Sequence, residues 1–149
     1  MSKSNTFENE LLLLIFQNAN MALVGDATGI RGSSVAGSLY LALHTADPGE
    51  AGDQSTNEVS YGSYARVAVA RTSGGFTVAG NNVQLVAKAT FPTGSSGTVS
   101  QNGAWVSVGV ASSGAGKILY RAQLSTALYT GLGVAPELNA GTGLSITED

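Results

Sequence analysis

From residue 38 onward, this chain is dominated by short stretches in which every second residue is apolar. That pattern predicts β-strands with one face turned inward. The alternating stretches cover residues 39–44, 66–70, 83–91, 105–110, 117–124 and 144–147. Turn-forming residues such as Asp47-Pro48-Gly49 and Gly94-Ser95-Ser96-Gly97 separate them. The sequence therefore predicts an all-β fold, an antiparallel sandwich or barrel, with a jelly-roll-like β-sandwich over residues 38–149 as the preferred form.

One helix is predicted near the N-terminus, over residues 5–20. Asn5 is expected to cap it, with Glu8 as the reciprocal partner three residues later. One face carries apolar side chains at helical spacing: Phe7, Leu11, Leu14 and Ile15. The other face carries Leu12, Leu13 and Phe16. A helix that is apolar nearly all round is buried on several sides, so it either closes the end of its own domain or inserts between subunits.

Composition points to a protein that works in an assembly. The chain has 149 residues, which predicts one domain over residues 1–149. Charged residues make up 11% of it, against about 25% in an ordinary soluble domain. Because a monomer usually needs a more charged surface, part of this surface is expected to be covered by other copies, in a homo-oligomer with a trimer as the expected state. The candidate assembly contacts are Phe7, Leu11, Leu14, Ile15, Phe16 and Trp105.

Charge and residue usage argue against several partners. The net charge is −3 and no cluster of Lys and Arg is visible, so nucleic acid is not an expected partner. There are no cysteines, which excludes disulfides and thiolate metal sites. The apolar run at residues 11–16 is far too short to span a bilayer, and the acidic stretch before it is unlike a signal peptide. No membrane partner is therefore expected.

Two segments imitate catalytic or binding motifs without completing them. Residues 111–118 resemble a phosphate-binding loop but have Ala111 where glycine is required and Ile118 where Ser or Thr is required, so a hairpin turn is predicted there. His44 is the one histidine, and a Ser-His-Asp triad would have to use it with Asp47 or Asp26. Without a nucleophile elbow, a surface or capping role is predicted for His44. The chain is not expected to be an enzyme, and neither catalytic residues nor cofactors are predicted.

An acidic loop at residues 47–53 is the remaining candidate for chemistry. Asp47, Glu50 and Asp53 are spaced three apart among Gly and Pro residues, the kind of oxygen-rich loop that calcium favours. The spacing does not match an EF-hand, and acidic turns are common on surfaces, so the sequence leaves a bound cation open and no metal ligand is assigned. Arg66, on the strand that follows, is expected to pair with Asp47 or Asp53 and to hold this loop in place.

The same region carries a resemblance to a known group of proteins. It comprises LALHTADPGEAGD at residues 41–53, then Asn57-Glu58, then Tyr64-Ala65-Arg66-Val67. In these residues the chain resembles a family of small tailed-phage virion proteins, often labelled tail fibre-like or head decoration proteins. The resemblance implies a structural protein of the particle with no catalytic residues to carry over. It does not fix whether the protein sits on the head or on the tail.

Two virion roles follow as expectations. The first is a capsid cement (decoration) protein on the capsid exterior, with the major capsid protein as partner, because no long fibrous or repetitive segment is present. The alternative is a tail or tail-fibre component, for example a receptor-binding module. A polysaccharide-degrading enzyme is the third class, and the absence of recognisable active-site groups disfavours it.

Overall fold

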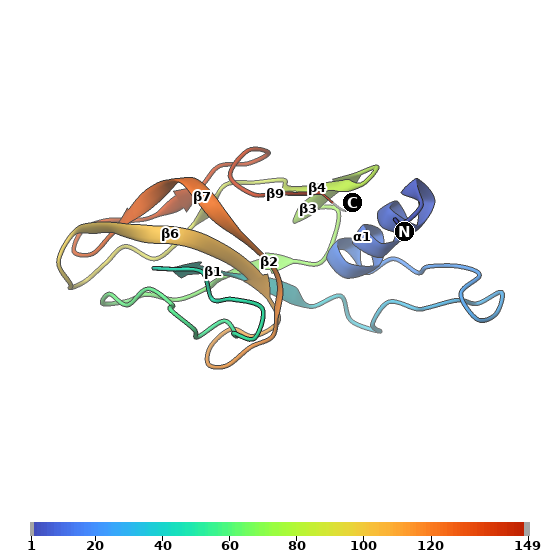
Figure 1. Cartoon of the computed structure of the whole chain (residues 1–149), viewed down its shortest axis with the longest axis horizontal. Helices are drawn as coiled ribbons and strands as arrows, with labels where there is room; N and C mark the ends of the chain where they lie inside the picture. The colour runs from blue at the N-terminus through green and yellow to red at the C-terminus, as the bar shows by residue number, and fades with distance from the viewer. Residues whose placement is uncertain (1, 148–149) are drawn as a thin grey trace. The chain divides into compact units, whose positions relative to one another are not determined.

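The computed structural model describes residues 2–147 (Figure 1). Its elements are α1 (Asn5–Gln17), β1 (Ser38–His44), β2 (Val67–Ala70), β3 (Phe76–Ala79), β4 (Asn82–Leu85), β5 (Ala89–Thr90), β6 (Ser100–Gly109), β7 (Ile118–Thr130), β8 (Glu137–Leu138) and β9 (Ser145–Thr147). The strands form sheets of order β2-β1-β6-β7, β3-β4-β9 and β5-β8. The predicted all-β class, with antiparallel sheets and one helix in the described part of the chain, is confirmed. A jelly-roll arrangement is not.

The chain divides into two compact units that are each discontinuous in sequence. The first unit comprises Met1–Ser38, Val69–Lys88 and Leu138–Asp149, and the second comprises Leu39–Ala68 and Ala89–Glu137. The single domain over residues 1–149 and the sandwich over residues 38–149 stay predictions.

In the first unit, the N-cap of α1 lies one residue before the predicted one. Ser4, not Asn5, is the N-cap, and its Oγ accepts a hydrogen bond from the backbone N–H of Phe7. The helix ends at Gln17 instead of residue 20 because Asn18 adopts a left-handed conformation, with φ 57°, and donates its N–H to the carbonyl of Leu13. The side chain of Asn18 then holds Ser33 through two hydrogen bonds, which turns the chain away from the helix axis.

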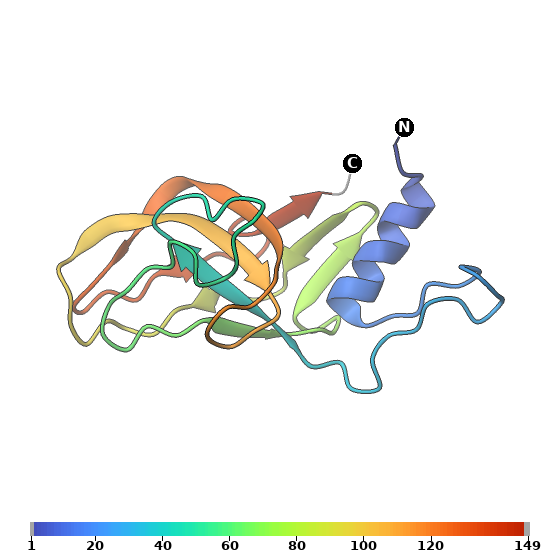
Figure 2. The same cartoon turned by 60° about the horizontal axis from the view of Figure 1, so that its bottom comes forward.

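One side of α1 supplies part of the core of the first unit. Glu8, Leu12 and Phe16 lie one turn apart and are buried, and the ring of Phe16 meets that of Phe76 edge-on with centroids 5.0 Å apart. Figure 2 shows α1 lying beside the β3–β4 hairpin, with which it is in contact. β4 pairs with β3 on one side and with β9 on the other, both antiparallel. The helix therefore packs on the β3–β4 hairpin of the three-stranded sheet of its own unit.

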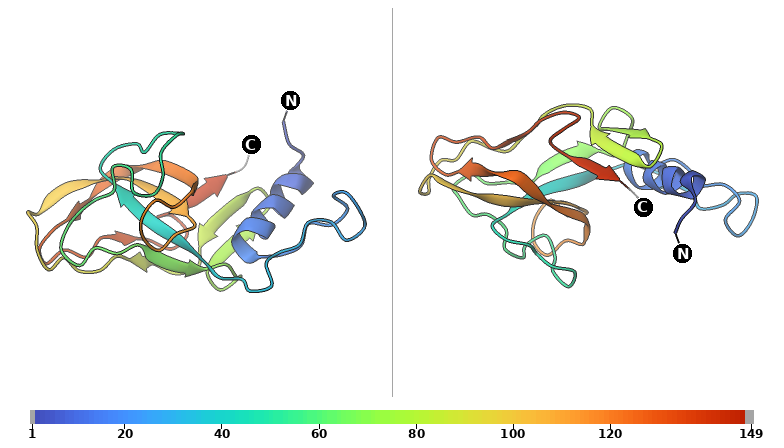
Figure 3. Two further views of the ribbon diagram at one scale, coloured as in Figure 1. Left: turned by 90° about the horizontal axis from the view of Figure 1, so that it is seen from below. Right: turned by 45° about the horizontal axis from the view of Figure 1, so that its top comes forward.

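In the second unit, β1 is paired with β6, and β6 is paired with β7, in antiparallel register. On one face of the sheet, Leu41 lies opposite Val108 and Leu43 lies opposite Val106, and all four are buried. The register of β6 and β7 shifts three times, which bends this long hairpin as both views in Figure 3 show. The opposite face of β1, with Ala42 and His44, is buried as well.

The predicted strand over residues 83–91 is two strands. β4 ends at Leu85 and β5 begins at Ala89, and the exposed residues 86–88 between them bend the chain, although the N–H of Val86 still donates to the carbonyl of Gly75 and so extends the pairing with the β3 side by one residue. The alternation of Val86 and Ala87 with their neighbours concealed that break. Two short strands, β3 and β8, were not predicted.

Candidate functional site

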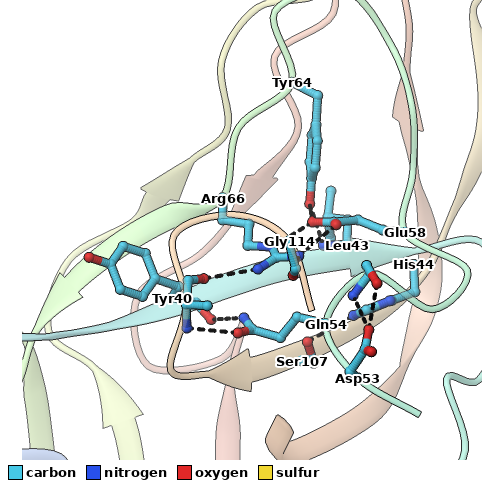
Figure 4. A network of polar contacts seen from close by, with 12 residues as sticks. Tyr40, Leu43, His44, Asp53, Gln54, Glu58, Tyr64, Arg66, Ser107 and Gly114 are labelled. Atoms are coloured by element: carbon cyan, nitrogen blue, oxygen red, sulfur yellow. Dashed lines mark hydrogen bonds and ion pairs between the residues drawn. The ribbon is translucent and has the colours of Figure 1, made fainter. Parts of the chain in front are cut away.

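A long loop after β1, residues 45–66, covers the second face of the sheet of the second unit (Figure 4). Several of its contacts with the sheet are made by buried polar groups. Three buried side chains fasten the loop to β1 and to the β6–β7 hairpin: Gln54, which contacts both, Arg66, which pairs with Glu58 and donates to the hairpin, and His44 of β1, whose ring contacts Thr56 of the loop. These contacts lie in the segment on which the resemblance to virion proteins rests. That segment is therefore the candidate functional site.

Gln54 is fully buried, and its side chain lies between β1 and the turn of the β6–β7 hairpin. Its Nε2 donates to the carbonyl of Tyr40, 3.2 Å away, and its Oε1 accepts from the N–H of Ala111 at 2.9 Å. Glycines make room for it: a Cβ on Gly109 would lie 2.2 Å from Cδ of Gln54, and one on Gly116 would lie 2.3 Å from its Oε1. The side-chain amide of Gln54 is therefore hydrogen-bonded on two sides, and no side chain larger than that of glycine fits beside it at positions 109 and 116.

Arg66 has a different partner from the one predicted. Its guanidinium forms a two-point pair with Glu58, with Nε–Oε1 at 2.7 Å and Nη2–Oε2 at 2.8 Å, and not with Asp47 or Asp53. It also donates to the carbonyls of Ala111 and Gly114. The hydrogen bond to Glu58 raises the pKa of Arg66, and burial raises that of Tyr64, whose hydroxyl donates to Glu58. Arg66 thus makes four hydrogen bonds, which join Glu58 to the β6–β7 hairpin. Few of its N–H groups are left to bind an anion.

Two of the three carboxylates of the acidic loop, those of Asp47 and Asp53, are engaged within the chain, and Glu50 is exposed. Asp47 accepts from the N–H of Gly49 and from Arg121, and these contacts lower its pKa. Asp53 accepts from the hydroxyl and the N–H of Ser55, which lowers its pKa too. Each makes an Asx turn of its own. Among residues 2–147, no three His, Asp or Glu side chains are grouped as metal ligands would be.

His44 is buried, which corrects the predicted surface or capping role. None of its surface is exposed, because the loop folds back over the end of β1. Its Nδ1 lies 2.8 Å from the carbonyl of Thr56, which can only accept, so Nδ1 carries the proton. Nε2 then accepts from the hydroxyl of Ser107 at 2.8 Å. Burial, the largest effect, lowers the pKa of His44.

The Ser107–His44 pair has the spacing of a nucleophile and its base, yet it cannot meet a substrate. Both residues have no exposed surface, so nothing can approach the serine oxygen. The segment that imitates a phosphate loop is the predicted hairpin turn, in which the N–H of Val110 is donated to Lys117, and the carbonyls of Ala111 and Gly114 accept from Arg66.

We expect the neutral, buried state of His44 to make the protein sensitive to mild acid. The unfolded chain binds a proton near pH 6.5 and the folded chain only at lower pH, so stability is complete above 6.5 and declines as the pH falls below it. The slope is at most about 1.4 kcal/mol per pH unit. Urea unfolding between pH 7.5 and 5 measures it. His44→Asn should flatten the curve in this window, whereas the aspartates act only near and below their ordinary value of 3.8. A wild-type curve that is already flat would contradict this assignment.

The predicted assembly residues of α1 fall on both sides of the helix. Phe16 has no exposed surface, so its side chain belongs to the core of the first unit and is not available to a partner. Phe7 is 41% exposed, and Leu11, Leu14 and Ile15 are half-buried. Trp105, also half-buried, lies on β6 opposite His44. Whether these residues contact another molecule stays a prediction.

Sequence reasoning missed a second set of exposed apolar side chains. In the first unit they include Leu23, Val24, Ile30 and Val35, and in the second they include Val99, Tyr129 and Leu132. The first four lie in an irregular segment without a strand or helix period, so no periodic signal marked them. Their density within 13 residues was the signal available in the sequence. Within residues 2–147, no helix has the length and apolar character of a membrane span.

A family model described as "Podophage GP4 fiber I protein gp80" matches residues 2–142, nearly the whole chain. No curated protein matches the chain.

Proposed function

This chain belongs to the family of the podophage GP4 fiber I protein gp80, and from that membership we propose that it is a structural component of the tail or tail fibre of a tailed-phage particle. The single observation that carries the proposal is the family match over residues 2–142. The family's description names a fibre protein, so it supports the tail or fibre alternative better than the capsid-cement role that the sequence placed first. Cement on the head, with the major capsid protein as partner, is the second candidate.

The geometry supports a role by contact, without catalysis. Ser107 and His44, the Ser–His pair of the described residues that has catalytic spacing, are both fully buried. Asp47 and Asp53 of the acidic loop accept hydrogen bonds from the backbone of the loop itself. Buried polar contacts hold residues 45–66 rigidly, as a surface that has to present a fixed shape requires. Self-association, with the trimer expected from the low charge, is part of the same proposal.

Heat release of DNA separates the two candidates. A cement protein binds the assembled shell and stabilises it by linkage, whereas a fibre protein leaves the shell as stable as before. We expect particles made without this protein to lose DNA at the same temperature as complete particles, and to attach to host cells more slowly. Release at a lower temperature together with normal attachment would overturn the fibre proposal in favour of cement.

A further inference from the structure

Residues 18–37 form a projecting segment of the first unit, which we call the arm. It leaves the C-terminal end of α1, runs out and back, and stands clear of the helix (Figure 2). Arg71 fixes both of its ends. The guanidinium donates to the carbonyls of Leu14 and Ile15 at the end of α1 and to that of Ala36 at the end of the arm, and its backbone N–H is donated to Gly37. The root of the arm is therefore clamped.

The arm is also ordered along its length by its own polar groups. Met21 and Ile30 exchange two backbone hydrogen bonds of 2.8 Å. Asn18 and Asn20 bind Ser33 and Gly32 across the arm, and Asp26 closes the tip by accepting from the backbone of Thr28 and Gly29. A segment held in this way keeps its shape before it meets a partner, which lowers the entropy lost on binding.

The arm nevertheless places its large apolar side chains in water. Leu23 is 80% exposed and Val35 is 77% exposed, with Val24 and Ile30 more than a third exposed. Leu23 also has a left-handed backbone, with φ 62°, which is unfavourable for a residue with a Cβ. Within the free chain, no contact of the Leu23 side chain compensates for its unfavourable backbone conformation or for its exposure to water. Both are accounted for if the side chain is buried by another molecule.

The same unit carries a surface of matching chemistry on α1. The side of the helix opposite to its buried residues presents Phe7, Leu11 and Leu14, spaced so that they share one face, and Glu10 lies on that face too. The side chain of Glu10 makes no hydrogen bond or ion pair with the described residues, and neither does that of Arg31 on the arm. An arm with a free cation among apolar residues thus complements a helix face with a free anion among apolar residues.

We propose that the arm of one copy binds the outer face of α1 of a second copy, with Leu23 and Val35 on Phe7, Leu11 and Leu14, and Arg31 beside Glu10. Two different surfaces meet in this contact, so repetition closes a ring, such as a trimer, or extends a filament. The occupant is another copy of this chain because both complementary surfaces are on this chain. The contact is a property of the purified protein, so its failure would leave the proposed place in the virion untouched.

Sedimentation velocity over a range of concentrations tests the apolar part. The wild-type chain should associate, and Leu23→Ser with Val35→Ser should weaken the dissociation constant by about tenfold to hundredfold, since each buried aliphatic side chain contributes strongly to binding. The matched control is Val86→Ser, an exposed valine of the same unit outside the arm. Unchanged thermal unfolding of both variants shows that they fold. A wild-type monomer at high concentration, or equal constants for the arm variant and the wild type, would overturn the proposal.

A charge exchange tests which surface receives the arm. Arg31→Glu alone and Glu10→Arg alone should each weaken association about two- to fivefold, as expected for an exposed ion pair and the repulsion that replaces it. The double variant restores the pair with its signs reversed and should recover wild-type affinity. If the double variant is as weak as the two single changes combined, the arm does not bind the helix face and the proposal fails.

Discussion

Replacing Arg66 with methionine should lower the free energy of unfolding by about 3–5 kcal/mol, the cost of breaking a buried ion pair by removing one partner. The guanidinium side chain is 2% exposed and its partner Glu58 is 17% exposed. Without Arg66, that carboxylate keeps only the hydroxyl of Tyr64, the carbonyl of Ala111 loses its donor, and the carbonyl of Gly114 keeps only the N–H of Gly116. Urea unfolding at neutral pH, where both groups are charged, measures the loss.

The control for Arg66 is the other arginine that pairs with the same loop. Arg121→Met breaks a 2.7 Å contact with Asp47 in which both side chains are more than a quarter exposed, so it should cost no more than about 1 kcal/mol. Glu58→Gln added to Arg66→Met should recover part of the loss, because an uncompensated charge is removed. Equal losses for Arg66→Met and Arg121→Met would mean that the buried pair does not fasten the loop.

Replacing Gly109 with alanine should cost about 2–4 kcal/mol, because overpacking alone costs about 1–3 kcal/mol and displacement of Gln54 loses hydrogen bonds of about 1 kcal/mol each. The new Cβ would lie 2.2 Å from Cδ of Gln54, which has no exposed surface and cannot swing into solvent. Thermal or urea unfolding of the purified variant measures the effect.

A double-mutant cycle identifies the cause of that loss. If the clash with Gln54 is responsible, Gly109→Ala should cost far less in a Gln54→Ala background, where the methyl group enters vacated space. Gly74→Ala is the matched control, since a Cβ there meets only Oγ1 of Thr72 at 3.5 Å, an ordinary contact. The same cost in both backgrounds would show that the side chain of Gln54 is not what requires glycine at this position.

The strands and the hairpins were predictable because each depends on local sequence. Period-two alternation located β1, β6 and β7, and the turn residues between β6 and β7 marked a hairpin in place of a phosphate loop. The break between β4 and β5 was not predictable in this way, since the residues at the break alternate as a strand does. Local pattern shows which segments suit a strand, and tertiary contacts decide where pairing stops.

The interior of the candidate site depends on the path of a loop, which the sequence does not reveal. Arg66 was expected to pair with a nearby aspartate, yet Asp47 and Asp53 satisfy themselves in local turns and leave Glu58 to the arginine. His44 stands at the end of a strand, where exposure is the usual outcome, but residues 45–66 return over it. Burial of such groups follows from chain trajectory and not from spacing along the sequence.

The family was within reach of the sequence, and the location on the particle was not. The segment around residues 41–67 suggested a tailed-phage virion protein, and the match over residues 2–142 confirms the virion family and favours a fibre over cement. Head and tail proteins can share compact β-rich folds, so neither fold nor composition distinguishes them.

Electron microscopy of intact particles labelled with a gold-conjugated antibody against this chain tests the central claim most directly. If the protein is a tail or fibre component, gold should lie at the tail or its fibres, with head surfaces as bare as those of particles made without the protein. Gold distributed over the head lattice, with bare tails, would contradict it.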